Sequence, residues 1–433
     1  MKKMWFRKSC KWAFSALFIS AIFWSCRDDE IVLPKYDPSL PVKVNSFVPD
    51  SGGVGTQLVV IGENFGSDTS LIKVFVNDNE AKVIGVNDTR VYAVVPVRAG
   101  TGNVRVEMQK QKTVSSEKQF KYKLQQNVLT VAGITDSDGN SDRVDGNLES
   151  AQFNFPYYMD IDDDDNIFLL ERNAYKSGST SHALRYVSLS ERSVSTKLTS
   201  GGATGNLRPI AYSITQDTLW CTNDTWNAGV DLFTLTRQQG WFDPTERLHA
   251  RTGNCVAVNP VDGSVVSSHY LKSKVNWLNT ATGEEKELLT LGENYVVYLA
   301  FSKDGEYLYM TIPEGYQAEK GKFYRAKWDY ATKTLNDPEM LISLGYLKQP
   351  RQVACDYEGN VYICDAGNHT IEIWNPKTRE IKTFAGIRGE KGYQDGLPLE
   401  SKFYHPTGIC VAKDGAIYVA DNFNHRIRKI VVE

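Results

Sequence analysis

Aromatic and arginine side chains recur in the loops of residues about 124–433, beside short apolar segments. Aromatic rings stack on the apolar faces of pyranose sugars, and Arg, Asn and Asp side chains hold hydroxyl and carboxylate groups. Trp226, just past Asp224, is the strongest single candidate for a stacking ring. The residues predicted to bind a sugar chain are Trp226, Tyr158, Tyr295, Tyr316, Tyr404, Arg208, Arg251, Arg351 and Asp224. The three arginines favour an acidic sugar. Each tyrosine has an alternative role as a structural cap, because exposed aromatics are common.

Histidine and serine motifs give no catalytic site. His369 and His425 occupy matching Asn-His pairs, which are expected to form hydrogen bonds that stabilise the fold. The other four histidines show no His-x-x-x-His spacing, and the chain has no Gly-x-Ser-x-Gly nucleophile elbow. No catalytic residue is therefore predicted.

One acidic stretch is a candidate calcium site. Asp136, Asp138, Asn140 and Asp142 alternate oxygen ligands as a calcium loop does. The glycine is displaced from its EF-hand position, and no glutamate closes the loop. Structural Ca²⁺ is one alternative here and a turn without an ion is the other; no other cofactor is expected.

The charge balance argues against a nucleic-acid partner. The chain has 49 Lys and Arg against 52 Asp and Glu, a formal net charge of −3. Five cations and no acidic residue lie in the first 25 residues, so the remainder carries −8. Proteins that bind nucleic acid present a basic stripe or excess instead.

The N-terminus has the pattern of an export signal. A basic segment precedes the apolar run 12–24, which is too short for a secure transmembrane helix. Ser25-Cys26 then resembles the cleavage box of bacterial lipoproteins, although Trp24 departs from the usual small or aliphatic residue. The resemblance implies a signal peptide over 1–25, acylation of Cys26 and a tether over 26–41. An ordinary secretory signal is the alternative.

Acidic residues directly behind Cys26 are similar to the surface-export signal of outer-membrane lipoproteins. The expected location is therefore the outer face of the cell outer membrane. The cysteines beyond Cys26 are odd in number and irregular in spacing, which predicts small buried hydrophobes and not disulfides or zinc ligands. They are Cys221, Cys255, Cys355, Cys364 and Cys410.

Residues 42–123 alternate short strands with turn signals, as a β-sandwich does. Pro49, then Gly55-Thr56, then Gly62-x-Asn64-Phe65-Gly66 appear in order, and this series resembles an IPT/TIG domain. The resemblance implies an immunoglobulin-like sandwich. Such domains in surface lipoproteins are usually spacers.

Residues 124–433 contain an internal repeat. Pro350, Asp365 and His369 recur 56 residues later as Pro406, Asp421 and His425. These copies resemble the NHL repeat of β-propellers. With four weaker copies upstream, the anchors Ile161, Ile214, Val258, Phe301, Cys355 and Val411 predict six blades.

A second match predicts how the ring closes. Thr130 to Ile134 repeats as Thr383 to Ile387, and Asp145-Gly146 repeats as Asp395-Gly396. Residues about 127–133 should therefore supply the outer strand of the last blade. The expected fold is all-β: an immunoglobulin-like (IPT/TIG) sandwich followed by a six-bladed NHL-type β-propeller.

This arrangement looks like the glycan-binding lipoproteins of polysaccharide-utilisation systems. The resemblance implies non-catalytic binding of a polysaccharide or oligosaccharide at the cell surface, beside a glycan transporter complex. Two alternatives stay open: a propeller enzyme acting on polysaccharide as a lyase or hydrolase, and a protein-interaction scaffold. The sequence does not name the glycan.

Overall fold

The computed structural model describes residues 35–96, 99–108, 112–123, 126–172, 182–199, 207–223, 232–248, 253–270, 273–291, 295–314 and 320–432. They form two compact units, with the division between Tyr122 and Lys123. The described part is strands, turns and short 3₁₀ segments, without an α-helix. Accordingly, these residues include no helix long and apolar enough to cross a membrane.

The first unit is an immunoglobulin-like sandwich with strand order β1-β3-β6-β5-β4-β7-β8-β2. Its strands are β1 (Lys43–Val48), β2 (Ser51–Gly52), β3 (Gln57–Glu63), β4 (Ile72–Val76), β5 (Asn79–Asn87), β6 (Arg90–Val94), β7 (Gly102–Met108) and β8 (Lys112–Tyr122). Every second residue of β3, β4 and β7 is buried, as expected for strands with one face on a core. Val60, Val74, Val104 and Phe120 form the centre of that core.

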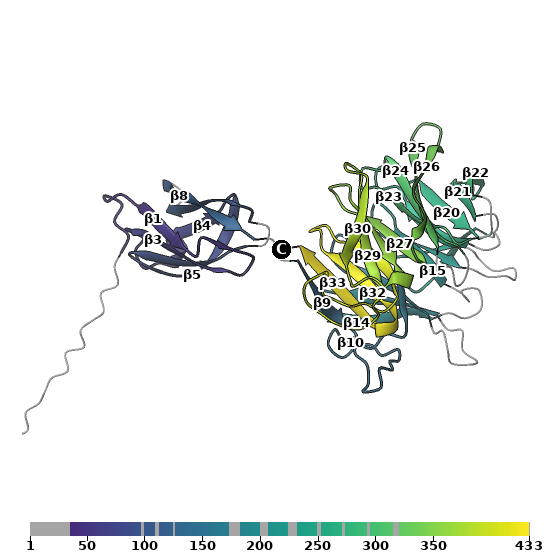
Figure 1. Ribbon diagram of the computed structural model, residues 1–433, viewed down its shortest axis with the longest axis horizontal. Helices are drawn as coiled ribbons and strands as arrows, with labels where there is room; N and C mark the ends of the chain where they lie inside the picture. The colour runs from purple at the N-terminus through teal and green to yellow at the C-terminus, as the bar shows by residue number, and fades with distance from the viewer. Residues whose placement is uncertain are drawn as a thin grey trace, which may run out of the picture. The chain divides into compact units, whose positions relative to one another are not determined.

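The second unit is a six-bladed β-propeller (Figure 1). The first blade consists of β11 (Pro156–Ile161), β12 (Asn166–Arg172), β13 (His182–Ser188) and β14 (Ser193–Thr199). The second consists of β15 (Leu207–Tyr212), β16 (Thr218–Asn223), β17 (Leu232–Thr236) and β18 (Thr245–Leu248). The third consists of β19 (Gly253–Val258), β20 (Val265–His269), β21 (Lys274–Leu278) and β22 (Glu285–Thr290). β10 (Gly146–Asn147) adds a short edge to the first blade.

The fourth blade consists of β23 (Tyr298–Phe301), β24 (Tyr307–Pro313), β25 (Gly321–Asp329) and β26 (Thr334–Leu347). The fifth consists of β27 (Pro350–Cys355), β28 (Val361–Asp365), β29 (Thr370–Asn375) and β30 (Glu380–Ala385). The sixth consists of β31 (Pro406–Val411), β32 (Ile417–Asp421), β33 (Arg426–Val432) and β9 (Gln126–Ala132). The inner strand of each blade packs beside the inner strands of its two neighbours. In the sixth blade every residue of β31 and β32 is buried, since both faces of the blade are covered.

The sixth blade closes the ring with a strand from the start of the propeller, as predicted. β9 pairs antiparallel with β33, with Val128 opposite Ile430 and Thr130 opposite Arg428. The two strands lie side by side in Figure 1 although about 300 residues separate them in sequence. The closure covers the outer edge of β33, which would otherwise be open for pairing with another chain.

The predicted register of the second blade was wrong by two residues. The repeat predicts that Ile214 is equivalent to Ile161, which ends β11, but β15 ends at Tyr212. The turn that follows runs from Ser213 to Thr218, joined by a hydrogen bond of 2.8 Å between their backbones. In the first blade the matching turn runs from Asp162 to Asn166 and is one residue shorter. Ile214 is therefore a turn residue, and 51% of it is exposed.

Buried arginines fix the loops that lead into two inner strands. Arg428 uses all five of its N–H donors, on Asp395, Asp421 and two loop carbonyls. Asp395 also accepts hydrogen bonds from Thr130 of β9. Arg185 makes the equivalent contacts with Asp145 and Glu171 in the first blade. The repeated segments Asp145-Gly146 and Asp395-Gly396 therefore have the same role, which is to hold a buried arginine.

The histidines of the repeat act as predicted. His369 and His425 both adopt the left-handed backbone conformation after a 3₁₀ turn. The Nδ1 of His369 accepts a hydrogen bond from the backbone of His405 (3.2 Å), and the Nδ1 of His425 accepts one from Phe155 (3.3 Å). Each ring thus ties one blade to the loop that enters the next. All five of the cysteines expected in the interior are buried and free.

The closure predicts that substitutions at two adjacent residues of β9 change the free energy of unfolding by very different amounts. Val128 is fully buried, whereas 47% of Leu129 is exposed. Val128→Asp should lower the free energy of unfolding by at least about 3 kcal/mol, because it loses an apolar contact and buries a charge. Leu129→Asp should change it by about 0.5 kcal/mol or less. Equal thermal melts of the two variants would contradict this account of the closure.

Candidate functional site

The six inner strands run in one direction around a central channel. We call the side where they begin the amino end of the channel and the side where they finish its carboxyl end. Polar side chains gather at both ends, and their composition differs.

Tyrosines and arginines form a cluster at the amino end. The hydroxyl groups of Tyr158 and Tyr298 are 2.9 Å apart, and Nη1 of Arg351 donates to the Tyr298 hydroxyl at 2.9 Å. The guanidinium carbons of Arg172 and Arg351 lie 5.4 and 6.0 Å from the centre of the Tyr157 ring. We call these five residues the arginine–tyrosine cluster.

The charges around Tyr157 favour an anion. Burial raises the pKa of this phenol, but Arg351, Arg172 and Arg208 outweigh it and bring the pKa down to about 8. Nearby, burial and then Arg351 lower the pKa of His405 to about 3, so its ring is neutral at pH 7. Neither Arg172 nor Arg351 forms an ion pair with any residue that the structure describes. Within the described part of the chain, the positive charge of the cluster therefore has no carboxylate counterpart.

Three of the predicted ligand-binding residues meet in or beside this cluster. Arg208 and Arg351 both act on the Tyr157 hydroxyl electrostatically. Tyr158 is 1% exposed, with its ring against Tyr157 and Tyr298, so its faces are covered by protein. Tyr157, the adjacent residue, lies closer to the arginines.

Two further predicted residues lie apart from these contacts. Tyr404 is half-buried at the start of the sixth blade, with its ring against Phe423 and Lys391. Tyr295 is half-buried against the core of the third and fourth blades, and its backbone donates to Ser273. Neither contact set includes a member of the arginine–tyrosine cluster.

The remaining predicted site residues, and the lipidation site, lie outside the described residues. These are Trp226, Asp224, Arg251, Tyr316 and Cys26. Their assignments stay predictions.

The calcium candidate forms a turn held by its own hydrogen bonds. The carboxylate of Asp136 accepts hydrogen bonds from the backbones of Asp138 (2.9 Å) and Asn140 (2.8 Å). The same Asp-x-x-x-Asn turn recurs at Asp162 and at Asp356. Among the described residues, no group of three or more His, Cys, Asp or Glu side chains is arranged to hold a metal ion. A bound Ca²⁺ at Asp136 stays a hypothesis.

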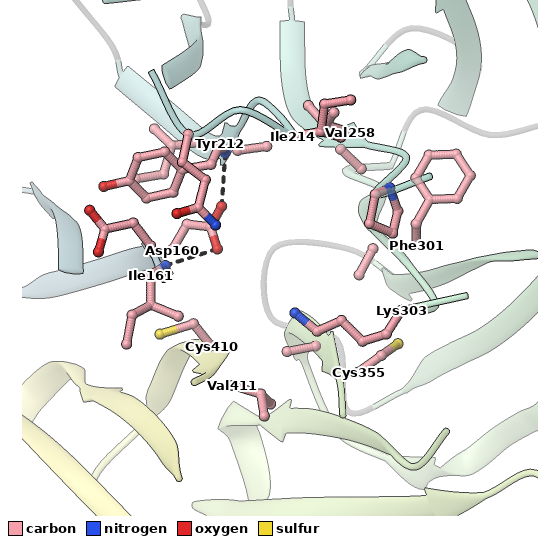
Figure 2. A pocket seen from close by; sticks show the side chains of 18 of the residues that line it. Asp160, Ile161, Tyr212, Ile214, Val258, Phe301, Lys303, Cys355, Cys410 and Val411 are labelled. Atoms are coloured by element: carbon pink, nitrogen blue, oxygen red, sulfur yellow. Dashed lines mark hydrogen bonds between the residues drawn. The ribbon is translucent and has the colours of Figure 1, made fainter. Parts of the chain in front are cut away.

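The carboxyl end of the channel holds a cavity of about 360 Å³, which we call the channel pocket (Figure 2). Residues from all six inner strands and the turns after them line it. Small and aliphatic side chains such as Ala211, Val258 and Val411 make much of its wall. The polar groups that face it come from only a few blades.

Asp160 and Gln352 are two of the polar residues that line the pocket. The two oxygens of Asp160 accept hydrogen bonds from the backbones of Ile161 and Tyr212, both at 2.9 Å. Burial raises the pKa of this carboxyl. The amide of Gln352 joins three inner strands, because it bonds to both backbone groups of Met159 (2.7 and 3.1 Å) and to the backbone of Ile409 (3.2 Å).

Lys303 supplies a cation to the pocket. Figure 2 shows its ammonium group pointing into the space that Asp160 faces from another blade. Its nitrogen lies 5.2 Å from the centre of the Tyr357 ring at the rim. Lys303 makes no hydrogen bond or ion pair with the residues that the structure describes. None of the predictions from sequence placed Asp160, Lys303 and Gln352 together, because they come from different blades that lie far apart in the sequence.

Comparisons with known proteins agree with both units. Residues 41–122 match the model of the IPT/TIG domain, and residues 403–430 match that of the NHL repeat. The chain joins an IPT/TIG domain to an NHL-type β-propeller. A 35% identical segment of 89 residues also occurs in human NHL repeat-containing protein 2, but it is 20% of this chain and only 12% of the human protein.

Two solved structures are similar to this chain over most of their length. One is an auxiliary nutrient binding protein from Bacteroides thetaiotaomicron VPI-5482, 26% identical, with a TM-score of 0.63 over 92% of this chain and 99% of that one. The other is an auxiliary nutrient binding protein from Bacteroides ovatus ATCC 8483, with a TM-score of 0.69 over 92% and 100% of the two chains. At 23% identity the second likeness shows the fold alone.

The arginine–tyrosine cluster predicts one tyrosine that ionises early. Ultraviolet absorbance should detect a phenolate that forms near pH 8, because the arginines lower the pKa of Tyr157. Since this pKa is below the ordinary value of 10.0, the tyrosinate's contribution to stability is fully present above about pH 10 and is lost as the pH falls through about 8. Tyr157→Phe should remove the transition. Tyr418→Phe should keep it, because burial raises the pKa of Tyr418. A transition near pH 8 that persists in Tyr157→Phe would contradict the assignment.

Proposed function

We propose that this protein binds polysaccharide at the cell surface without cleaving it. The observation that carries the proposal is the likeness, across both units, to a protein described as an auxiliary nutrient binding protein. The acylated Cys26 would hold the chain in the outer membrane, and the IPT/TIG domain would act as a spacer.

The amino end of the channel supports an acidic glycan as ligand. Arg172 and Arg351 lie there without carboxylate partners among the described residues, beside the ring of Tyr157. Guanidinium groups bind carboxylates and sulfates through paired hydrogen bonds, and aromatic rings contact the C–H faces of sugars. β16 and β24 finish, and β17, β19 and β25 begin, at this same end. In the sequence Trp226, Tyr316 and Arg251 lie between these strands, outside the described residues. We therefore place the glycan site at the amino end.

An enzyme acting on the same polysaccharide is the main alternative. A lyase or hydrolase needs a converging acid and base, or a metal, at the reacting bond. Tyr157 is the one group of the arginine–tyrosine cluster with a pKa near neutral. Chain-length analysis of a bound polysaccharide during long incubation with the purified protein separates the two functions. Unchanged length supports binding alone, and progressive shortening would overturn it.

Two tryptophans should respond in opposite ways. Trp226→Ala should weaken binding about tenfold or more, because a stacked ring contributes on the order of 1–3 kcal/mol, and it should barely change the melting temperature. Trp374 is 1% exposed and packs edge-on against Tyr309 and Phe323 at 5.8 Å. Trp374→Ala should cost about 3–5 kcal/mol of stability and leave the affinity of the folded protein intact.

A glycan array with neutral and uronate-containing polysaccharides would supply the ligand, and calorimetric titration of both variants would give the affinities. Arg379→Gln is a matched control for substitutions of Arg172 and Arg351, since Arg379 pairs with Glu339 on an outer strand. Unchanged affinity in Trp226→Ala would remove that residue from the site. If the protein binds only neutral polysaccharides, the hypothesis of an acidic glycan ligand is excluded.

The anchor is tested separately. Cys26→Ala should release the protein from membranes, because the acyl chains on this residue are its proposed attachment. Membrane fractionation of cells that express the variant measures the effect. A variant that still sediments with the outer membrane would contradict lipid anchoring at Cys26.

A further inference from the structure

The channel pocket lies at the opposite end of the inner strands from the arginine–tyrosine cluster. Its volume of about 360 Å³ falls in the range of small-molecule sites, roughly 300–1,000 Å³. A cavity of this size accommodates a sugar unit and not a folded partner. The pocket is therefore separate from the glycan site proposed above.

Among the described residues, two of the charged groups that line the pocket have no ion-pair partner, Asp160 and Lys303. Asp163 pairs with Lys413 at 3.2 Å, and Asp162 pairs with Arg237 at 3.1 Å. The carboxylate of Asp160 accepts two backbone hydrogen bonds. The ammonium of Lys303 has the Tyr357 ring beside it and acts on Asp160 and Asp163 only through longer-range electrostatics. This ammonium is therefore available to pair with a negative group of a ligand.

The wall offers hydrogen bonds at a distance from that cation. A carboxylate has about four acceptor positions, of which backbone groups use two at Asp160. The Gln352 amide nitrogen has two N–H groups, and Met159 takes one of them. Asp160 and Lys303 form no ion pair with each other, so the space between them separates the two charges (Figure 2). A ligand that contacts both the ammonium of Lys303 and the hydrogen-bonding groups of the wall must carry hydroxyl donors beside its anionic group.

We infer that the channel pocket binds a small hydroxylated carboxylate, that is, a sugar acid. Its carboxylate would pair with the ammonium of Lys303, its hydroxyls would bond to Asp160 and Gln352, and its C–H face would lie against Val258 and Val411. An amino acid fits less well, because the Asp160 carboxyl already has two donors and its environment disfavours charge. The site needs no co-reactant and involves no covalent step.

Calorimetric titration of the full chain with glucuronate, and with glucose as the neutral match, tests this inference. Glucuronate should bind the wild type, and glucose should bind at least tenfold more weakly. Lys303→Gln should weaken glucuronate at least tenfold, because a hydrogen bond to a charged group is lost. Thermal melts should be unchanged, since Lys303 contributes no hydrogen bond or ion pair within the described fold.

Two controls separate this site from others. The nitrogen of Lys429 lies 5.4 Å from the centre of the Tyr418 ring, a contact similar to that of Lys303 with Tyr357 at 5.2 Å. Lys429 does not line the pocket, so Lys429→Gln should bind glucuronate normally. Arg379→Gln, at a surface residue that pairs with Glu339 and does not line the pocket, should also bind it normally. No binding by the wild type, equal binding by Lys303→Gln, or loss of binding in Arg379→Gln would each overturn the inference. Polysaccharide binding is measured in a separate experiment, so the glucuronate titration can be interpreted even if the proposed function fails.

Discussion

The hydrogen bonds between β9 and β33 are the interaction on which the propeller depends, because they turn a row of sheets into a ring. Without β9, the sixth blade would lack its outer strand, and Val128 and Ile430 would lose the contacts they share. The ring in turn brings six inner strands to one axis. Arg351, Tyr298 and Tyr157 come from three blades, and only this convergence brings them within contact distance. The same convergence creates the channel pocket.

Buried charge reinforces the closure. Arg428 and Asp421 have no exposed side-chain surface and are 2.7 Å apart, so removing either partner would leave an uncompensated charge and cost about 3–5 kcal/mol. Arg428 also holds Asp395, and Asp395 holds Thr130 of the closing strand. The loop into the sixth inner strand, the third strand and the closing strand are thus one connected network. The beginning of β31, near Tyr404, inherits its position from this network, since Asp421 also accepts the backbone N–H of Tyr404.

The fold was predictable from sequence where local chemistry repeats. The Asp-x-x-Asn-His segments at 365–369 and 421–425 each encode a 3₁₀ turn and a left-handed histidine, so their copies are recognisable. The second blade lacks those residues, and its longer turn shifted the predicted register to Ile214. In the candidate site, the predicted residues Arg351, Arg208 and Tyr158 lie together, and Tyr157, whose ring lies near Arg172 and Arg351, is the neighbour that the prediction did not single out. An irregularity between Pro156 and Tyr158 in β11 interrupts the simple alternation of faces, so spacing alone did not separate the two tyrosines. The sequence did not predict the channel pocket, because Lys303 and Asp160 lie on different blades and meet only when the ring closes.

Hydrogen exchange of the intact protein, with and without a polysaccharide that it retains, tests most directly whether the propeller channel is the binding element. We expect slower exchange in peptides that contain the beginnings of the inner strands, around Tyr157, Arg208 and Arg351, with no change in residues 41–122. Protection confined to residues 41–122 would show that the IPT/TIG domain carries the ligand, and it would contradict the role assigned to the propeller.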